Sequence, residues 1–380
     1  MTKPNQLPKD FKKEKMKFNL DGQKLAWHQD RLRQWLAGER IAPITVDMAL
    51  TRACNFRCIY CYGQLQENHG KPLSELAILN FLDDATEIGV KAVSFVSDGE
   101  STLSPHLATA IKHGWMNGLD MALGTNGLLL NDPGAILPYL TYLRFNISGA
   151  ERKRYSEIMG VPVVFYDRVI SNIKTCVAMK RAWKLPVTIG IQMVLMPSFA
   201  DQVMPLARLG KGLGVDYTII KHCSDDEFHG LGVDYSKYKH LDVLLRKAES
   251  LSTDEYQVAV KWSKIMSGGK RGYTKCFGPA FLMQLSGSGL VAPCGMLFNE
   301  RYKDEFHIGN IGETRFKDIW KSDRYWEVLT RLHSPEFNPQ TMCGSLCLQH
   351  KVNEYLWDLL NNGAMPQSPE GEPPPHKDFI

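Results

Sequence analysis

Three cysteines stand close together near the start of the chain, at Cys54, Cys58 and Cys61. Thiolates with this spacing on a loop can chelate soft iron, and three of them leave one iron of a [4Fe-4S] cluster open to a further ligand. Tyr60, just before the last cysteine, adds a flat aromatic surface where a nucleobase could rest. Half of a zinc site is the alternative, although zinc sites usually combine paired CxxC units with a fourth Cys or His. The spacing favours iron.

Four further cysteines lie in the last third of the chain, at Cys276, Cys294, Cys343 and Cys347. Residues 285–291 have the pattern of a β-hairpin, which would bring the first two of these cysteines together. Four thiolates saturate a cluster, and a saturated cluster suits electron transfer because no iron is open to substrate. A structural zinc site is the alternative, and spacing alone does not exclude it.

The composition is that of an ordinary globular protein, with 44% hydrophobic and 23% charged residues among 380. A net charge of +4 is too weak to indicate nucleic-acid binding. The sequence has no apolar run of membrane-spanning length and no secretory signal, so we expect no membrane span. Nine cysteines without an export signal predict a reducing, cytoplasmic location in which thiols serve metals or catalysis.

The elements that must position these residues follow from hydrophobic periodicity. Residues 25–36 predict a helix that ends at Gly38. From residue 44 onward, β-branched runs alternate with helical stretches, which predicts a parallel sheet with right-handed crossovers. Strands are expected at residues 44–50, 92–96, 121–124, 142–147, 187–195 and 217–221.

The cysteine loop from Cys54 to Cys61 resembles the CxxxCxΦC loop of the radical S-adenosylmethionine (SAM) enzymes, where Φ is aromatic. The six strand-helix units resemble the partial (β/α)₆ barrel of that superfamily, an α/β fold. The resemblance implies that three cysteines hold a [4Fe-4S] cluster whose open iron chelates the amino and carboxylate groups of SAM.

The second cysteine group resembles the CX₉₋₁₅GX₄C opening of the SPASM and Twitch auxiliary-cluster domains, with Gly289 at the glycine position between Cys276 and Cys294. Only Cys343 and Cys347 follow, as in the Twitch form. The resemblance implies one auxiliary [4Fe-4S] cluster held by four cysteines. The expected domains are an N-terminal helical extension (1–43), the barrel (44–250), a connecting segment (251–275), the cysteine-rich domain (276–350), and a C-terminal helix with a disordered or surface-draped tail (351–380).

A polar loop after the second predicted strand contains Asp98, Gly99 and Glu100. Its position matters because functional groups in parallel barrels collect at the carboxyl ends of strands. The loop resembles the GGEP loop that binds the SAM amino group in the superfamily, with Asp98 and Ser101 in place of the first Gly and the Pro. The resemblance places all three residues beside SAM.

Later strand ends supply the remaining candidates. Asn126 and Ser148 resemble positions that face SAM in the superfamily, and Gln192 must point into the barrel or be buried with a partner. After the sixth strand, Cys223 could donate a hydrogen atom to a substrate radical and Lys221 could move a proton.

The resemblance implies reductive cleavage of SAM to methionine and a 5′-deoxyadenosyl radical, which abstracts hydrogen from an unactivated C–H bond. It also implies a low-potential electron donor such as flavodoxin or ferredoxin. We expect a two-electron oxidation of a small metabolite, of sugar or aminocyclitol type, with the auxiliary cluster as electron acceptor. A redox-neutral epimerase using Cys223, a peptide-modifying maturase and a non-catalytic zinc-binding scaffold are the alternatives. Residues 1–43 are too short for a leader-peptide recognition module, which favours a small molecule over a peptide.

Overall fold

A curved sheet of ten strands forms the centre of the protein, in a computed structural model that describes residues 18, 23–68, 70–362 and 366–380. Its strand order is β10-β9-β8-β1-β2-β3-β4-β5-β6-β7, and the strands from β1 to β7 pair in parallel. The six predicted strands are present as β1 (Thr45–Met48), β2 (Ala92–Phe95), β3 (Asp120–Thr125), β4 (Tyr142–Asn146), β5 (Thr188–Leu195) and β6 (Tyr217–His222).

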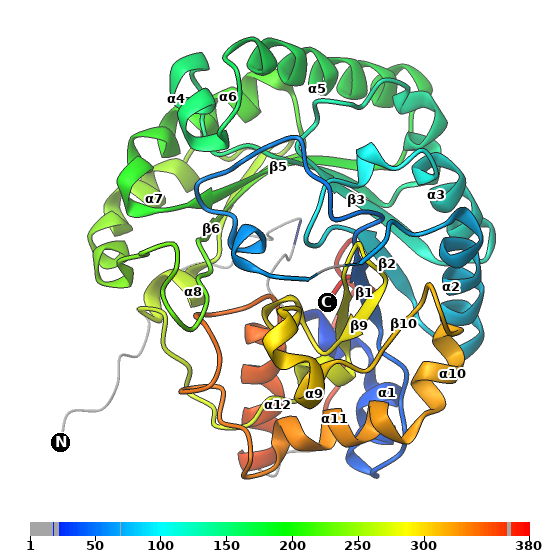
Figure 1. Ribbon diagram of the computed structural model, residues 1–380. Helices are drawn as coiled ribbons and strands as arrows, with labels where there is room; N and C mark the ends of the chain where they lie inside the picture. The colour runs from blue at the N-terminus through cyan, green and yellow to red at the C-terminus, as the bar shows by residue number, and fades with distance from the viewer. Residues whose placement is uncertain (1–17, 19–22, 69, 363–365) are drawn as a thin grey trace, which may run out of the picture.

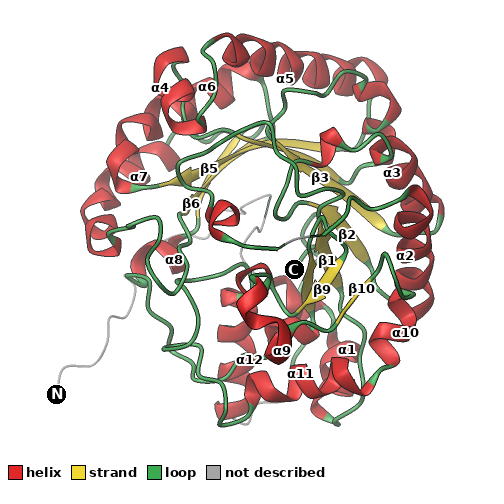
Figure 2. Ribbon diagram, in the orientation of Figure 1, coloured by secondary structure: helices red, strands yellow, loops and turns green. Residues whose placement is uncertain are grey.

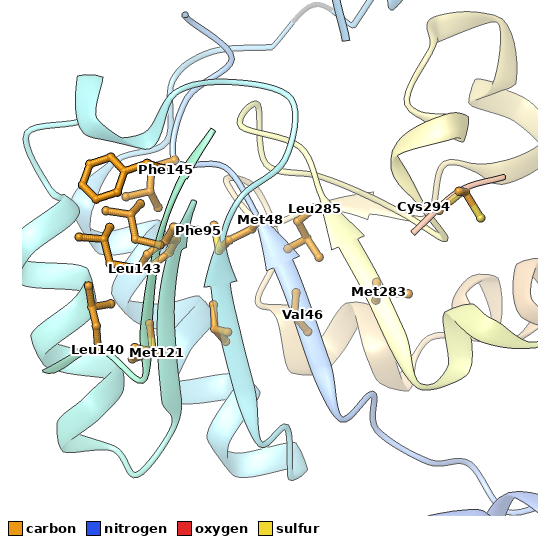
Figure 3. Close-up of a cluster of buried hydrophobic side chains, with 14 of the residues drawn as sticks. Val46, Met48, Phe95, Met121, Leu140, Leu143, Phe145, Met283, Leu285 and Cys294 are labelled. Carbon is orange, nitrogen blue, oxygen red and sulfur yellow. The ribbon is translucent and has the colours of Figure 1, made fainter. Parts of the chain in front are cut away.

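Helices cover the convex face of this sheet and leave its concave face as the lumen of a barrel (Figures 1 and 2). Side chains alternate between the two faces of a strand, so every second residue points toward the helices. Figure 3 shows such buried apolar side chains, among them Val46, Phe95 and Leu143. The covering helices are α2 (Glu75–Ile88), α3 (Leu107–Met116), α4 (Arg152–Met159), α5 (Val164–Trp183), α6 (Val203–Leu213) and α7 (Asp242–Glu249).

The sheet continues beyond the six predicted strands on both sides. β7 (Gln257–Val260) lies in the expected connecting segment and pairs with β6. On the other side, β8 (Leu282–Leu285) pairs in parallel with β1 and forms the predicted hairpin with β9 (Leu290–Ala292), followed by β10 (Gly309–Asn310). The cysteine-rich segment is therefore joined to the barrel through one continuous sheet.

Short helices complete the structure around the hairpin. The predicted N-terminal helix is present as a 3₁₀ turn (Gln23–Trp27) followed by α1 (Gln29–Leu36), and Gly38 ends it with a φ of 78°. None of the helices among the described residues is long and apolar enough to cross a membrane. The others are α8 (Trp262–Met266), α9 (Lys303–Phe306), α10 (Phe316–Lys321), α11 (Asp323–His333) and α12 (His350–Asn362).

The C-terminal tail closes the amino end of the barrel, so the expectation of a disordered or surface-draped tail is wrong for its last residues. Phe379 is buried with its ring 4.9 Å from that of Tyr142. The carbonyl of Asp378 accepts a 2.6 Å hydrogen bond from Thr45 Oγ1, and His376 is buried next to them. The reason is local: the stretch is proline-rich and charged on average, but its short apolar end fills the base of the lumen.

Candidate active site and auxiliary metal centre

The first three cysteines lie on the loop that follows β1, at the carboxyl end of the barrel. Cys54 is exposed, whereas Cys58 and Cys61 are partly buried, and none forms a disulfide. The end of α4 holds this loop through a 3.0 Å hydrogen bond from the Ile59 amide to the Ile158 carbonyl. Burial raises the pKa of Cys58, and the neighbouring thiols of Cys61 and Cys54 add to that shift. A bound cation would reverse this shift, because it stabilises thiolates.

Tyr60 is packed into the protein beside the cysteine loop. Its side chain is almost fully buried, and its hydroxyl donates to Met159 Sδ at 3.2 Å. Its backbone carbonyl lies 3.5 Å from Cys223 Sγ. The ring therefore packs against the cysteine loop, and its contact with a nucleobase stays a prediction.

Gly99 brings the loop after β2 directly against the segment that leads into the cysteines. A Cβ atom at Gly99 would lie 1.9 Å from the Thr51 carbonyl oxygen, a contact that only glycine avoids. The next residue continues this approach, because the Glu100 amide donates to the Ala53 carbonyl at 3.0 Å. The glycine thus fixes the distance between two loops of the site.

The Glu100 carboxylate joins the loops that follow β2 and β3. Its side chain is buried, and Oε1 accepts from the Thr102 amide, Thr102 Oγ1 and Thr125 Oγ1 at 3.1, 2.7 and 2.7 Å. Oε2 accepts from the Asn126 amide at 2.7 Å. Four donors surround this carboxylate, so it orients the backbone on which Asn126 lies.

Asp98 connects the barrel to the β8–β9 turn. Its carboxylate accepts from Arg52 Nε at 3.1 Å, Ser286 Oγ at 2.5 Å and the Gly287 amide at 2.8 Å. The glycine that stands here in the GGEP loop has no side chain for such contacts. Sequence reasoning placed Asp98 beside SAM, but in the structure its carboxylate is engaged with the auxiliary segment, and no local sequence signal indicated this partner.

The other predicted SAM contacts lie at the ends of β3, β4 and β5, and all are buried. Asn126 Nδ2 donates to Asn55 Oδ1 at 2.7 Å, beside the first cysteine. Ser148 Oγ accepts a backbone amide of β5 at 3.1 Å, and Gln192 Nε2 donates to Asn146 Oδ1 at 2.9 Å. The structure therefore brings these residues to the same carboxyl end as the cysteine loop.

The two predicted catalytic residues have different surroundings. Cys223 is 0% exposed, with Sγ 3.5 Å from the Tyr60 carbonyl and 3.4 Å from that of Ser224, and burial raises its pKa to about 12. Lys221 lies on the lumen face of β6 and keeps some accessible surface. Burial, followed by the charge of Arg144, lowers the pKa of Lys221 well below its usual value.

The second cysteine group, Cys276, Cys294, Cys343 and Cys347, lines a single cavity between the β8–β9 hairpin and α12. Burial raises the pKa of Cys294, and the other three thiols raise it further. Burial also raises the pKa of Cys343 to about 11, while the positive charge of Arg271 opposes this shift. All four cysteines thus line one cavity, and the other three thiols act electrostatically on Cys294.

Arg271 holds the loop that carries the last two cysteines, a role that sequence reasoning missed. Its guanidinium donates to the carbonyls of Pro339, Gly344 and Ser345 at 3.0, 2.5 and 2.6 Å, and it lies 3.5 Å from Cys343 Sγ. A guanidinium offers five donors in a fixed fork, which suits it to several carbonyls at once. No spacing rule marks such a residue in a sequence.

Asn353 on α12 braces the first cysteine of this group. Its Nδ2 lies 3.4 Å from Cys276 Sγ, and its Oδ1 accepts from the amides of Phe277 and Gly278 at 2.6 and 2.8 Å. Four converging thiols, a buried cation and an amide donor directed at sulfur fit an iron–sulfur cluster, whose thiolate ligands accept hydrogen bonds. The three thiols after β1 fit a second cluster with one open position.

Tyr62 lies between the two cysteine groups. Burial raises its pKa, and the charges of Cys294 and Cys61 add to that shift. Its hydroxyl lies close to the backbone beside Cys294, since a Cβ atom at Gly295 would be 3.1 Å from it. One aromatic side chain therefore contacts the surroundings of both groups.

Two known sequence families match these two regions. The radical SAM superfamily matches residues 48–209, and the SPASM iron-sulfur cluster-binding domain matches residues 276–347. The chain belongs to the radical SAM superfamily. The matches support bound SAM, a [4Fe-4S] cluster at the first group and an auxiliary iron–sulfur cluster at the second, in agreement with the donor sets described above.

Several radical SAM proteins are similar in sequence or fold to part or most of this chain. An AdoMet-dependent heme synthase of Methanosarcina barkeri is 25% identical over 338 residues, which are 82% of this chain and 90% of that protein. A probable GTP 3′,8-cyclase of Saccharolobus solfataricus is 29% identical over 172 residues, 44% of this chain and 53% of that protein, so this chain spans about half its length. Streptococcus suis SuiB bound to SAM has the same fold, with a TM-score of 0.60 and 16% identity over 79% of this chain and 71% of that chain.

Proposed function

We propose that this radical SAM enzyme removes two electrons from a C–H group of a small metabolite, of sugar or aminocyclitol type. When bound, SAM and the first cluster supply a 5′-deoxyadenosyl radical, and the auxiliary cluster supplies an acceptor for the second electron. The observation that carries the proposal is the auxiliary cavity, because all four thiols line it and would saturate a cluster. Tyr62, packed between both cysteine groups, supports an electron path between them.

The residues of the barrel have positioning roles in this proposal. Asn126, Ser148 and Gln192 line the carboxyl end of the lumen and orient SAM, while Glu100 fixes the backbone of Asn126. Gly99 keeps the loop after β2 against the cysteine segment. Holding a C–H group close to the reacting atom and excluding water is the main contribution that a protein makes to cofactor chemistry of this kind.

A small-molecule substrate is favoured over a peptide for two reasons. The tail closes the amino end of the lumen, which leaves entry from the carboxyl end. The heme synthase and the GTP cyclase are both named for small molecules. Peptide-bound SuiB, at 15% identity, shares the fold alone.

The burial of Cys223 favours oxidation over epimerisation, because a hydrogen-atom donor must touch the substrate radical and this sulfur contacts two carbonyls instead. We expect Cys223→Ala to form the same product as the wild type. A variant that still cleaves SAM but yields a different or trapped product would favour the epimerase.

The decisive experiment is reconstitution without oxygen, followed by measurement of iron, sulfide and zinc per chain. We expect about eight irons, and about four when Cys54, Cys58 and Cys61 are all replaced by Ala, as two cubane clusters require. Cys176→Ala is the matched control, because Cys176 lies in the apolar core between α5 and the sheet. The wild type, but not the triple variant, should form 5′-deoxyadenosine from SAM and dithionite. Zinc with little iron would contradict the proposal.

A further inference from the structure

Two basic side chains lie on the lumen face of the barrel strands. Arg144 lies on β4 between Leu143 and Phe145, which point outward and are fully buried, whereas Arg144 keeps accessible surface on the lumen side. Lys221 occupies a corresponding lumen position on β6 and is also partly accessible. Both side chains are therefore only partly buried in the barrel.

Neither basic group makes an ion pair or a hydrogen bond with a carboxylate among the residues that the structure describes. Arg144 Nε is buried without a hydrogen bond, and the guanidinium packs 5.6 Å from the ring centre of Tyr142. Within the described part of the chain, Lys221 likewise makes no hydrogen bond or ion pair. Cations removed from bulk water cost free energy unless they are paired, so these two groups are incompletely satisfied in the free protein.

Within the described part of the chain, one carboxylate acts electrostatically on Arg144. Asp47 on β1 is the nearby carboxylate, and it accepts a hydrogen bond from Ser94 Oγ. Among the described residues, Arg144 and Lys221 both act electrostatically on Asp47, so two basic groups lie near this one carboxylate. An imbalance of this sign attracts an anion, and low-dielectric walls strengthen that attraction.

We propose that Arg144 and Lys221 bind an anionic group of the substrate, either a phosphate or a pair of carboxylates. The inference deepens the proposed function and rests on it, since it concerns the substrate of that same barrel. Arg144 precedes Ser148 by four residues, about 13 Å along an extended strand. The anionic group therefore binds deep in the lumen, and the carbon that reacts lies at the other end of the substrate, near the carboxyl end of the barrel.

Binding to the reconstituted holoenzyme tests this assignment without turnover. Isothermal titration with sodium pyrophosphate and with sodium succinate, at constant ionic strength, would be compared for wild type, Arg144→Gln and Lys221→Met. Lys174→Met is the matched control, because Lys174 is exposed on α5. We expect one anion per chain, and at least a tenfold rise in Kd in each lumen variant but not in the control, as loss of a charge-assisted hydrogen bond predicts.

Comparing the affinities of the two anions distinguishes the two possible classes of substrate. Tighter binding of pyrophosphate indicates a phosphate-bearing substrate, and tighter binding of succinate indicates a carboxylate-bearing one. Binding of neither anion, or binding that both lumen variants leave unchanged, overturns the inference. If Arg144→Gln fails to fold, the Kd of Lys221→Met alone tests the assignment. Formation of 5′-deoxyadenosine without substrate is measured in parallel, so a failure of the proposed radical chemistry is distinguishable from a failure of the anion site.

Discussion

The buried carboxylate of Glu100 provides a sharp test of how this site is assembled. In Glu100→Gln, the side-chain carbonyl can keep the three donors at the Oε1 position, namely the amide and hydroxyl of Thr102 and the hydroxyl of Thr125. The new NH₂ group then faces the Asn126 amide, which donated to Oε2. One charge-assisted hydrogen bond is lost, and the Asn126 amide and the new NH₂ group are both left as buried donors without an acceptor, which together cost about 3 to 5 kcal/mol.

The assay is urea unfolding of the metal-free protein under anaerobic, reducing conditions, with SAM binding to the reconstituted protein as a second readout. Glu255→Gln is the control, because Glu255 is exposed in a turn and should change the free energy of unfolding by less than about 0.5 kcal/mol. We expect Glu100→Gln to lose both stability and SAM affinity, since the Asn126 backbone is no longer held. An unfolding midpoint equal to that of the control would refute the role assigned to this carboxylate.

Three further predictions concern the site, the auxiliary centre and the lumen. Gly99→Ala should abolish SAM binding, because its Cβ would lie 1.9 Å from the Thr51 carbonyl oxygen; unchanged affinity by equilibrium dialysis would contradict the close approach. Arg271→Met should lower the iron content of the reconstituted protein toward about four iron atoms per chain, because three loop carbonyls lose their hydrogen-bond donor. The control variant Lys270→Met, at an exposed position, should keep the iron content of the wild type. Burial raises the pKa of Asp47 to about 6, so the free energy of unfolding should fall by about 2 kcal/mol between pH 4 and 6, and Asp47→Asn should remove that fall in urea titrations at each pH. Equal pH profiles for the two proteins would argue against this burial.

Local patterns in the sequence were sufficient for the barrel and for both cysteine groups. The alternation of strand and helix patterns predicted the six parallel strands, because burial against the helices imposes a regular spacing of apolar residues along the sequence. The contacts that remained hidden join residues far apart in the chain. Asp98 and Ser286 are separated by 188 positions, and Arg271 reaches carbonyls about 70 residues later. Such partners leave no local period or spacing, so only the folded structure identifies them.

The pairing of β8 with β1 places both cysteine groups on one hydrogen-bonded framework, reinforced by the contacts of Asp98 with the β8–β9 turn. A hinge between the two metal-binding regions would have to break these backbone hydrogen bonds. The separation between the two cysteine groups is therefore fixed by the fold, and the electron transfer that we propose between them would need no domain movement. Control over turnover then falls to the loops that admit the substrate.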